Sequence, residues 1–134
     1  MPGFLTHFTN NEVLDYFFGC HETPVRPVLW VGLATNPANK EGVINELTSP
    51  GYSRACMPNT SKFFGRAKNG KKQTVADIVF PAFALNGERI ATVFISDSVR
   101  DGIVLAMVDM DPPYATAPCV RAKIRAGALT ISHS

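Results

Sequence analysis

The sequence contains few cysteines, and they are widely spaced. Its 134 residues include only Cys20, Cys56 and Cys119. No two of them form a Cys-x-x-Cys pair, and no histidine stands at a spacing suited to zinc. We therefore expect no disulfide framework, no bound metal and no other cofactor.

The net charge is also low, and long apolar runs are missing from the sequence. Thirteen Lys and Arg against eleven Asp and Glu give a net charge of +2, far below the basic balance typical of nucleic-acid-binding proteins. No stretch approaches the roughly 20 apolar residues that span a bilayer, and no basic run precedes an apolar one at the N-terminus. We expect neither nucleic acid nor a membrane as partner, and a protein folded in a cytoplasm.

The chain does contain enough apolar residues for a core. Hydrophobic residues make up 46% of the sequence and charged residues 18%, which excludes a disordered tail. A chain of this length buries roughly two-thirds of its unfolded surface, so one core suffices without disulfides or metals. We expect residues 1–134 to fold as one domain.

One helix is predicted near the N-terminus, over residues 10–18. Thr9 and Glu12 have the spacing of a capping box, and Gly19 stands where a left-handed C-terminal cap is needed. The expected apolar stripe consists of Val13, Leu14, Phe17 and Phe18. A short helix is marginal alone, so we expect this stripe to pack on other structure.

Strand-length segments bounded by glycine and proline follow the helix. Residues 28–34 form an apolar run that ends at Asn36-Pro37, which predicts a buried strand. The other predicted strands are residues 75–80, 89–96, 103–109, 119–126 and 128–132. This spacing predicts a mainly β fold over residues 28–132, an antiparallel β-sandwich or barrel with one short N-terminal α-helix. Residues 36–50 and 59–73 are expected to be two long loops, and Asn86-Gly87 a tight turn.

Groups suited to catalysis are not brought together by the sequence. His7, His21 and His133 lie near the two ends of the chain, and only Cys20 is next to a histidine. Neighbours in sequence usually point in different directions, and nothing supplies an oxyanion hole. We therefore expect no enzyme activity. The acids near the turns, Asp97, Asp101, Asp109 and Asp111, lack the spacing of a calcium loop and are expected to be solvated.

The candidate partner contacts are two groups of cations. The first, called here the basic segment, contains no acid and consists of Lys62, Arg66, Lys68, Lys71 and Lys72. Its aromatic residues, Phe63 and Phe64, are adjacent and so form no extended stacking platform for nucleic acid. A solvated or partner-facing loop is the favoured interpretation.

The second group is Arg121, Lys123 and Arg125. These residues alternate with apolar ones, so a strand there places three cations on one face. That face is either solvated or paired with the acidic turn region of a neighbouring subunit, a pairing that charge reversal at Lys123 would break.

Five segments, taken in order, resemble a family of small tailed-bacteriophage virion proteins that are often labelled tail-fibre proteins. They are residues 5–15 (LTHFTNNEVLD), 29–37 (LWVGLATNP), 51–54 (GYSR), 78–82 (IVFPA) and 124–131 (IRAGALTI). The resemblance implies a structural role without catalytic residues. The basic segment and the acids Asp109 and Asp111 depart from the Gly-rich, weakly charged middle of the relatives, and we interpret them as an adaptation to a partner.

The resemblance implies a virion protein assembled in the host bacterial cytoplasm, at one of two locations. A capsid-decorating (cement) protein would bind the major capsid protein and copies of itself, as trimers at junctions between capsomers, and stabilise the shell. The alternative is a tail-fibre or tail-tip component that contacts tail proteins or a host surface receptor. The short chain, without heptads or repeats, argues against an elongated shaft and favours decoration.

A third hypothesis is a small sugar- or protein-binding module with Trp30, Tyr52 or Tyr114 on an open face. Trp30 lies within an apolar run, however, so we expect it in the core.

Overall fold

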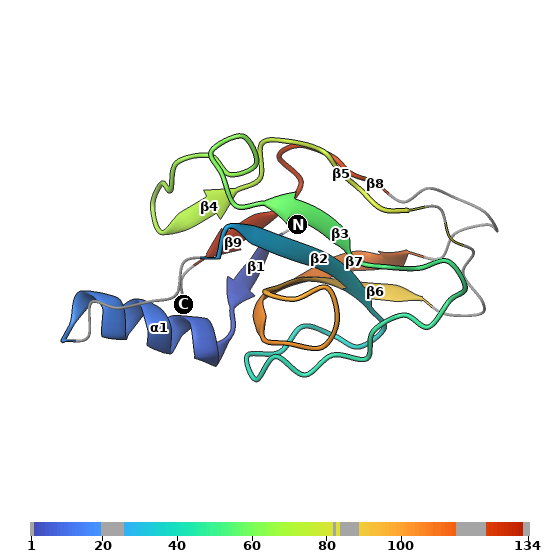
Figure 1. Cartoon of the computed structure of the whole chain (residues 1–134), viewed down its shortest axis with the longest axis horizontal. Helices are drawn as coiled ribbons and strands as arrows, with labels where there is room; N and C mark the ends of the chain where they lie inside the picture. Colours follow the sequence, from blue (N-terminus) through green and yellow to red (C-terminus); the bar gives the residue numbers. More distant parts are fainter. Residues whose placement is uncertain (1, 20–25, 82, 84–88, 115–122, 133–134) are drawn as a thin grey trace.

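The fold is mainly β, as predicted, with a single helix beside a curled sheet (Figure 1). The computed structural model describes residues 2–19, 26–81, 83, 89–114 and 123–132. The elements are β1 (Pro2–Leu5), α1 (His7–Phe17), β2 (Val28–Ala34), β3 (Ala55–Pro58), β4 (Lys71–Gln73), β5 (Ile78–Val79), β6 (Ile90–Ser96), β7 (Val104–Tyr114), β8 (Lys123–Ile124) and β9 (Thr130–Ser132).

Seven strands form one curled sheet in the order β3-β2-β6-β7-β1-β9-β4, and β5 pairs with β8 in a second, two-stranded sheet. Every pair is antiparallel except β1 and β9, which run parallel. The predicted antiparallel arrangement is therefore correct for all pairs but this one. β1 and β9 are separated by most of the chain, which allows parallel pairing because no tight turn has to join them.

The large sheet buries side chains on both faces because successive residues of a strand point in opposite directions. Leu29, Val31 and Leu33 of β2 face the larger cluster, where they meet Ile78 of β5 and Ile124 of β8. Figure 1 shows β5 and β8 above this face. The small sheet therefore covers the large one as the second layer of a sandwich does.

A smaller cluster lies on the opposite face and consists of Ala34, Phe94, Val104 and Met107. Residues 36–50 form a loop, as predicted, and Ile44 of this loop packs against the cluster. Gly32 is required under the Phe94 ring, because a β-carbon there would overlap the ring atoms.

Residues 59–73 do not form one long loop. Lys68 and Lys71 exchange backbone hydrogen bonds of 2.8 and 2.9 Å around a turn whose Asn69 and Gly70 both have positive φ. The chain then continues as the edge strand β4. Asn-Gly supplies the two left-handed residues that such a tight turn needs, a signal that the sequence does contain.

Strand boundaries differ from the predictions in several elements. β2 has the predicted bounds, whereas β5 is shorter than residues 75–80 and β7 runs to Tyr114, beyond the predicted residues 103–109. Residues 119–122 of the predicted strand 119–126 lie outside the described residues, and β8 begins directly after them. β1, β3 and β4 were not predicted. Asn86-Gly87 lies outside the described residues.

The predicted start of the helix is wrong. α1 begins at His7, with Thr6 in the N-cap position, and no side chain caps it. The Thr6 hydroxyl instead donates to the Val104 carbonyl at 2.7 Å, and the Thr9 hydroxyl to that of Leu105 at 2.8 Å. The threonines thus join the helix to β7. Gly19, directly after the C-cap residue, has the expected positive φ of 112°.

Candidate functional site

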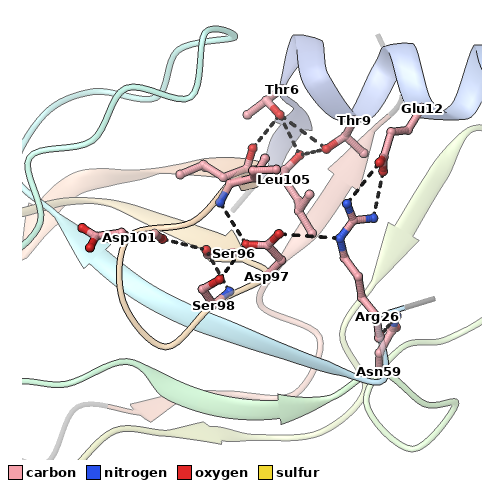
Figure 2. A network of polar contacts seen from close by, with 12 residues as sticks. Thr6, Thr9, Glu12, Arg26, Asn59, Ser96, Asp97, Ser98, Asp101 and Leu105 are labelled. Carbon is pink, nitrogen blue, oxygen red and sulfur yellow. Dashed lines mark hydrogen bonds and ion pairs between the residues drawn. The ribbon is translucent and has the colours of Figure 1, made fainter. Parts of the chain in front are cut away.

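Arg26, just before β2, joins the helix to the turn between β6 and β7 (Figure 2). Its Nη1 and Nη2 donate to the two carboxylate oxygens of Glu12 at 2.8 and 3.1 Å. Its Nε lies 3.9 Å from Asp97 Oδ2, which is an ion-pair distance but too long for a hydrogen bond. The hydrogen bonds that Arg26 donates to the Glu12 carboxylate raise the pKa of Arg26. The guanidinium therefore stays charged and holds the middle of α1 against the sheet.

Asp97 also organises the turn that follows β6. Its Oδ1 accepts hydrogen bonds from the Ile103 backbone N–H at 2.9 Å and from the Ser98 hydroxyl at 3.0 Å. Asp109 Oδ1 likewise accepts from the Ala38 N–H at 2.8 Å. The expectation that these acids are solvated is wrong for the partly buried Asp97, whose carboxylate fixes the turn after β6, whereas Asp109 is exposed as expected and also holds the 36–50 loop.

The other two turn acids have different positions. The Asp101 side chain is exposed, as expected, and the Asp111 side chain lies outside what the structure describes. In the described part of the chain, no three His, Cys, Asp or Glu side chains gather as a metal site requires.

A hollow of about 550 Å³ lies between α1, β2 and the β6–β7 turn. We call it the Trp30 hollow. Its apolar lining comes from Phe8, Val28, Trp30 and Ile103. Its charged lining is Glu12, Arg26 and Asp97. The Arg26 guanidinium lies 5.9 Å from the centroid of the Phe8 ring, a cation–π contact.

Trp30 is only partly buried, which corrects the prediction that it belongs to the core. Period-2 alternation places Trp30 on the same face as Val28, which is 36% exposed, whereas Leu29 and Val31 face the larger cluster. The uniformly apolar sequence of residues 28–34 hid this difference between the faces.

The second half of α1 and the residue after it carry exposed apolar side chains. We call this surface the apolar end of α1; its residues and exposed fractions are Leu14 (50%), Tyr16 (46%), Phe17 (65%) and Phe18 (78%). No residue of α1 is buried. The expectation that the phenylalanines pack on the rest of the chain is therefore wrong. In Figure 1 the helix extends beyond the sheet, with this end farthest from it.

A second arginine cluster lies beneath the 36–50 loop. The Arg54 side chain is 2% exposed, and its Nε and Nη2 donate to the two carboxylate oxygens of Glu46 at 2.8 and 2.9 Å. Its Nη1 donates to the Ser98 and Asp101 carbonyls at 2.7 and 2.9 Å and to the Ser96 hydroxyl at 3.2 Å. Arg54 thus fastens the 36–50 loop to the β6–β7 turn.

Tyr52 completes this buried cluster. Its hydroxyl donates to Glu46 Oε2 at 2.6 Å and accepts from the Leu33 backbone N–H at 2.9 Å. Burial raises the pKa of Tyr52 above its ordinary value near 10, and the hydrogen bond to Glu46 adds to the rise. Residues 51–54 are therefore structural.

The basic segment is exposed along the β4 edge of the large sheet. Lys62, Arg66, Lys68, Lys71 and Lys72 are all exposed, and none forms an ion pair with the described part of the chain. Lysines on an edge strand discourage pairing with further strands. This edge is also partly covered by the chain itself, because Gly65 N–H donates to the Gln73 carbonyl at 2.9 Å and Lys68 pairs with Lys71.

The second cationic group is not seen as one strand face. Lys123 begins β8, which ends at Ile124, so Arg125 lies beyond the strand, exposed. Arg121 lies outside the described residues.

No helix in the described ranges is long and apolar enough to cross a membrane. A family model described as "Podophage GP4 fiber I protein gp80" matches residues 5–132, nearly the whole chain. The chain belongs to this podophage fibre family. It is therefore a structural protein of a tailed-phage virion, and the resemblance noted in the sequence is confirmed. Among curated proteins, none matches the chain.

In this member of the fibre family, the Arg26 network could not be predicted from the sequence. Arg26 and Glu12 are 14 residues apart, and Asp97 is far from both, so no short motif contains them. The alternation in β2 exposes Trp30 on the face opposite the larger cluster, but the uniformly apolar sequence of residues 28–34 carries no sign of it.

Proposed function

We propose that this chain is a compact subunit of a podophage tail-fibre assembly, held to a neighbouring tail protein through the apolar end of α1. The observation that carries the proposal is the exposure of Leu14, Tyr16, Phe17 and Phe18 on one projecting helix end. Contiguous exposed apolar surface is typical of protein interfaces, and burial of each large side chain contributes about 1.5–3 kcal/mol.

The attachment of the helix supports this proposal. Thr6 and Thr9 fix its start to β7, and the Glu12–Arg26 pair fixes its middle. The apolar end is thereby held in a defined orientation without being covered. A helix presented in this way can enter a groove on another protein with little further ordering.

Capsid decoration remains a second candidate. The sequence contains no coiled-coil heptads or repeats. A compact subunit of this kind fits the surface of a capsid as well as a tail fibre. Gold-labelled antibody against this chain distinguishes the two. Label at tails supports the fibre proposal, and label spread over heads contradicts it and supports decoration.

The helix contact is tested by virion incorporation of a chain carrying Phe17→Gln and Phe18→Gln. Both side chains are exposed, so we expect the variant to fold with an unchanged melting temperature but to be lost from purified virions. Asn11→Gln, at another exposed position of α1, is the matched control and should be incorporated normally. Normal incorporation of the double variant would overturn the proposed contact.

A further inference from the structure

We propose that the Trp30 hollow binds a neutral saccharide, with the Trp30 indole stacked on a sugar ring and Asp97 accepting a hydroxyl hydrogen bond. This function goes beyond assembly, because its contacts are made in the hollow and not by the exposed side chains of the apolar end of α1.

The hollow offers an aromatic surface on a rigid support. Trp30 lies within β2, between Cys56 of β3 and Ser96 of β6, so its backbone is held on both sides. The ring is partly exposed and makes no ring contact or cation–π contact with the described residues. The flat apolar face of an indole suits the C–H face of a sugar ring, and its N–H remains available as a donor.

The polar groups beside Trp30 are already ordered, and one acceptor remains available. Asp97 Oδ1 is used by Ile103 and Ser98, whereas Oδ2 has only the 3.9 Å contact with Arg26. The two terminal nitrogens of Arg26 are directed to Glu12. A ligand hydroxyl can therefore donate to Asp97 Oδ2 without breaking a hydrogen bond, and preordering of this kind favours affinity.

Charge argues for a neutral ligand. The two carboxylates of Glu12 and Asp97 against one guanidinium leave the hollow with one negative charge. This charge disfavours acidic sugars and free anions. A cationic ligand is also disfavoured, because Arg26 already occupies the cation position beside both carboxylates and the Phe8 ring.

The size of the hollow fits a small ligand. Its volume of about 550 Å³ falls within the range of about 300–1,000 Å³ that is typical of ligand pockets. Apolar surface from Val28 and Ile103 lies beside the charged network. Small-molecule binding sites usually combine a few polar groups with apolar ones in this way.

Trp30 is the single tryptophan of the chain, so its fluorescence reports on this hollow directly. The experiment titrates the full chain with maltotriose, chitotriose and a rhamnose trisaccharide as neutral probes, and with sialyllactose and trigalacturonate as acidic ones. We expect a saturable change in emission with at least one neutral probe and none with the acidic probes. No response to any neutral probe, or a stronger response to an acidic one, would overturn the proposal.

Variants then locate the binding by calorimetry. We expect Trp30→Ala to weaken binding by at least about tenfold, since truncating a central aromatic contact has effects of this size. Trp30→Phe retains an aromatic ring and should weaken binding less than Trp30→Ala. If the alanine variant does not fold, the affinity of Trp30→Phe can still be compared with that of the parent chain. Unchanged affinity in a folded Trp30 variant would place the sugar elsewhere and contradict the proposal.

The Phe17→Gln and Phe18→Gln chain separates this proposal from the assembly proposal. We expect it to bind the neutral sugar with unchanged affinity, even if it is lost from virions. The same titration is run with a purified tail protein in place of a sugar. If this protein quenches Trp30 fluorescence in the parent chain but not in the Phe17/Phe18 variant, the hollow is part of the assembly interface. In that case the saccharide proposal fails.

Discussion

The two arginine clusters use the same chemistry in different surroundings. Arg26 and Arg54 each donate two hydrogen bonds to one glutamate, but the Arg26 side chain is 18% exposed and that of Arg54 only 2%. Arg54 binds further acceptors in three residues of β6 and the turn after it, whereas Arg26 reaches only a distant Asp97 oxygen. From this difference we expect a bidentate pair to contribute strongly to stability where all its donors are buried and used, as in the Arg54 cluster. Where it is partly exposed, it positions a surface.

The largest expected effect comes from breaking the buried cluster. Arg54→Ala removes two hydrogen bonds to the Glu46 carboxylate, which keeps that of the Tyr52 hydroxyl, and it removes the hydrogen bonds to the Ser98 and Asp101 carbonyls. Because Arg54 is buried but the Glu46 side chain is 27% exposed, we expect the free energy of unfolding to fall by about 3 kcal/mol, the lower end of the range for breaking a buried pair. Denaturant unfolding measures this loss. A loss below about 1 kcal/mol would show that the Arg54 cluster is not the main fastening of the 36–50 loop.

A pH titration distinguishes the two arginine clusters, because only the Arg54 cluster contains a tyrosine hydroxyl, that of Tyr52. The pKa of Tyr52 is raised in the folded state, so the unfolded chain loses its proton first as pH rises. Stability contributed by the protonated Tyr52 is therefore complete below about pH 10 and falls above it. Thermal unfolding of the parent chain and of Tyr52→Phe checks this, and the variant should lack that fall. An equal fall in both chains would assign it to other groups.

A smaller effect is expected from the partly exposed cluster. Arg26→Ala should lower the global free energy of unfolding by only about 1 kcal/mol, because solvent screens the Glu12 pair. The Arg26→Ala variant should instead loosen α1. Faster hydrogen exchange of the backbone amides of α1 would report this change. High salt should loosen the helix of the parent chain in the same direction. If Arg26→Ala lowered the global free energy of unfolding as much as Arg54→Ala does, the proposed distinction between the two clusters would be wrong.

The part of this fold that sequence predicts is the part fixed by local pattern. β2 has its predicted bounds because an apolar run between turn residues determines it, and Gly19 ends the helix by its backbone freedom. The helix start was misplaced because the Thr6 and Thr9 hydroxyls bond to β7, about a hundred residues away. Long-range partners of this kind leave no mark on local spacing.

The candidate site was harder to predict for the same reason. The Glu12–Arg26–Asp97 network joins three separate segments, and β1 and β4 pair with strands far away in the sequence, β1 with β7 and β9 and β4 with β9. The cations singled out in the sequence are exposed where the structure describes their side chains. Their charge alone did not show whether they bind a partner or protect a sheet edge.

Cryo-electron microscopy of the intact virion tests the central claim most directly, namely that α1 is positioned to bind a neighbouring tail protein. The account predicts density for this chain in a tail-fibre assembly, with Phe17 and Phe18 buried against another polypeptide. Density for this chain on the capsid shell, or in the tail with both phenylalanines open to solvent, would contradict it.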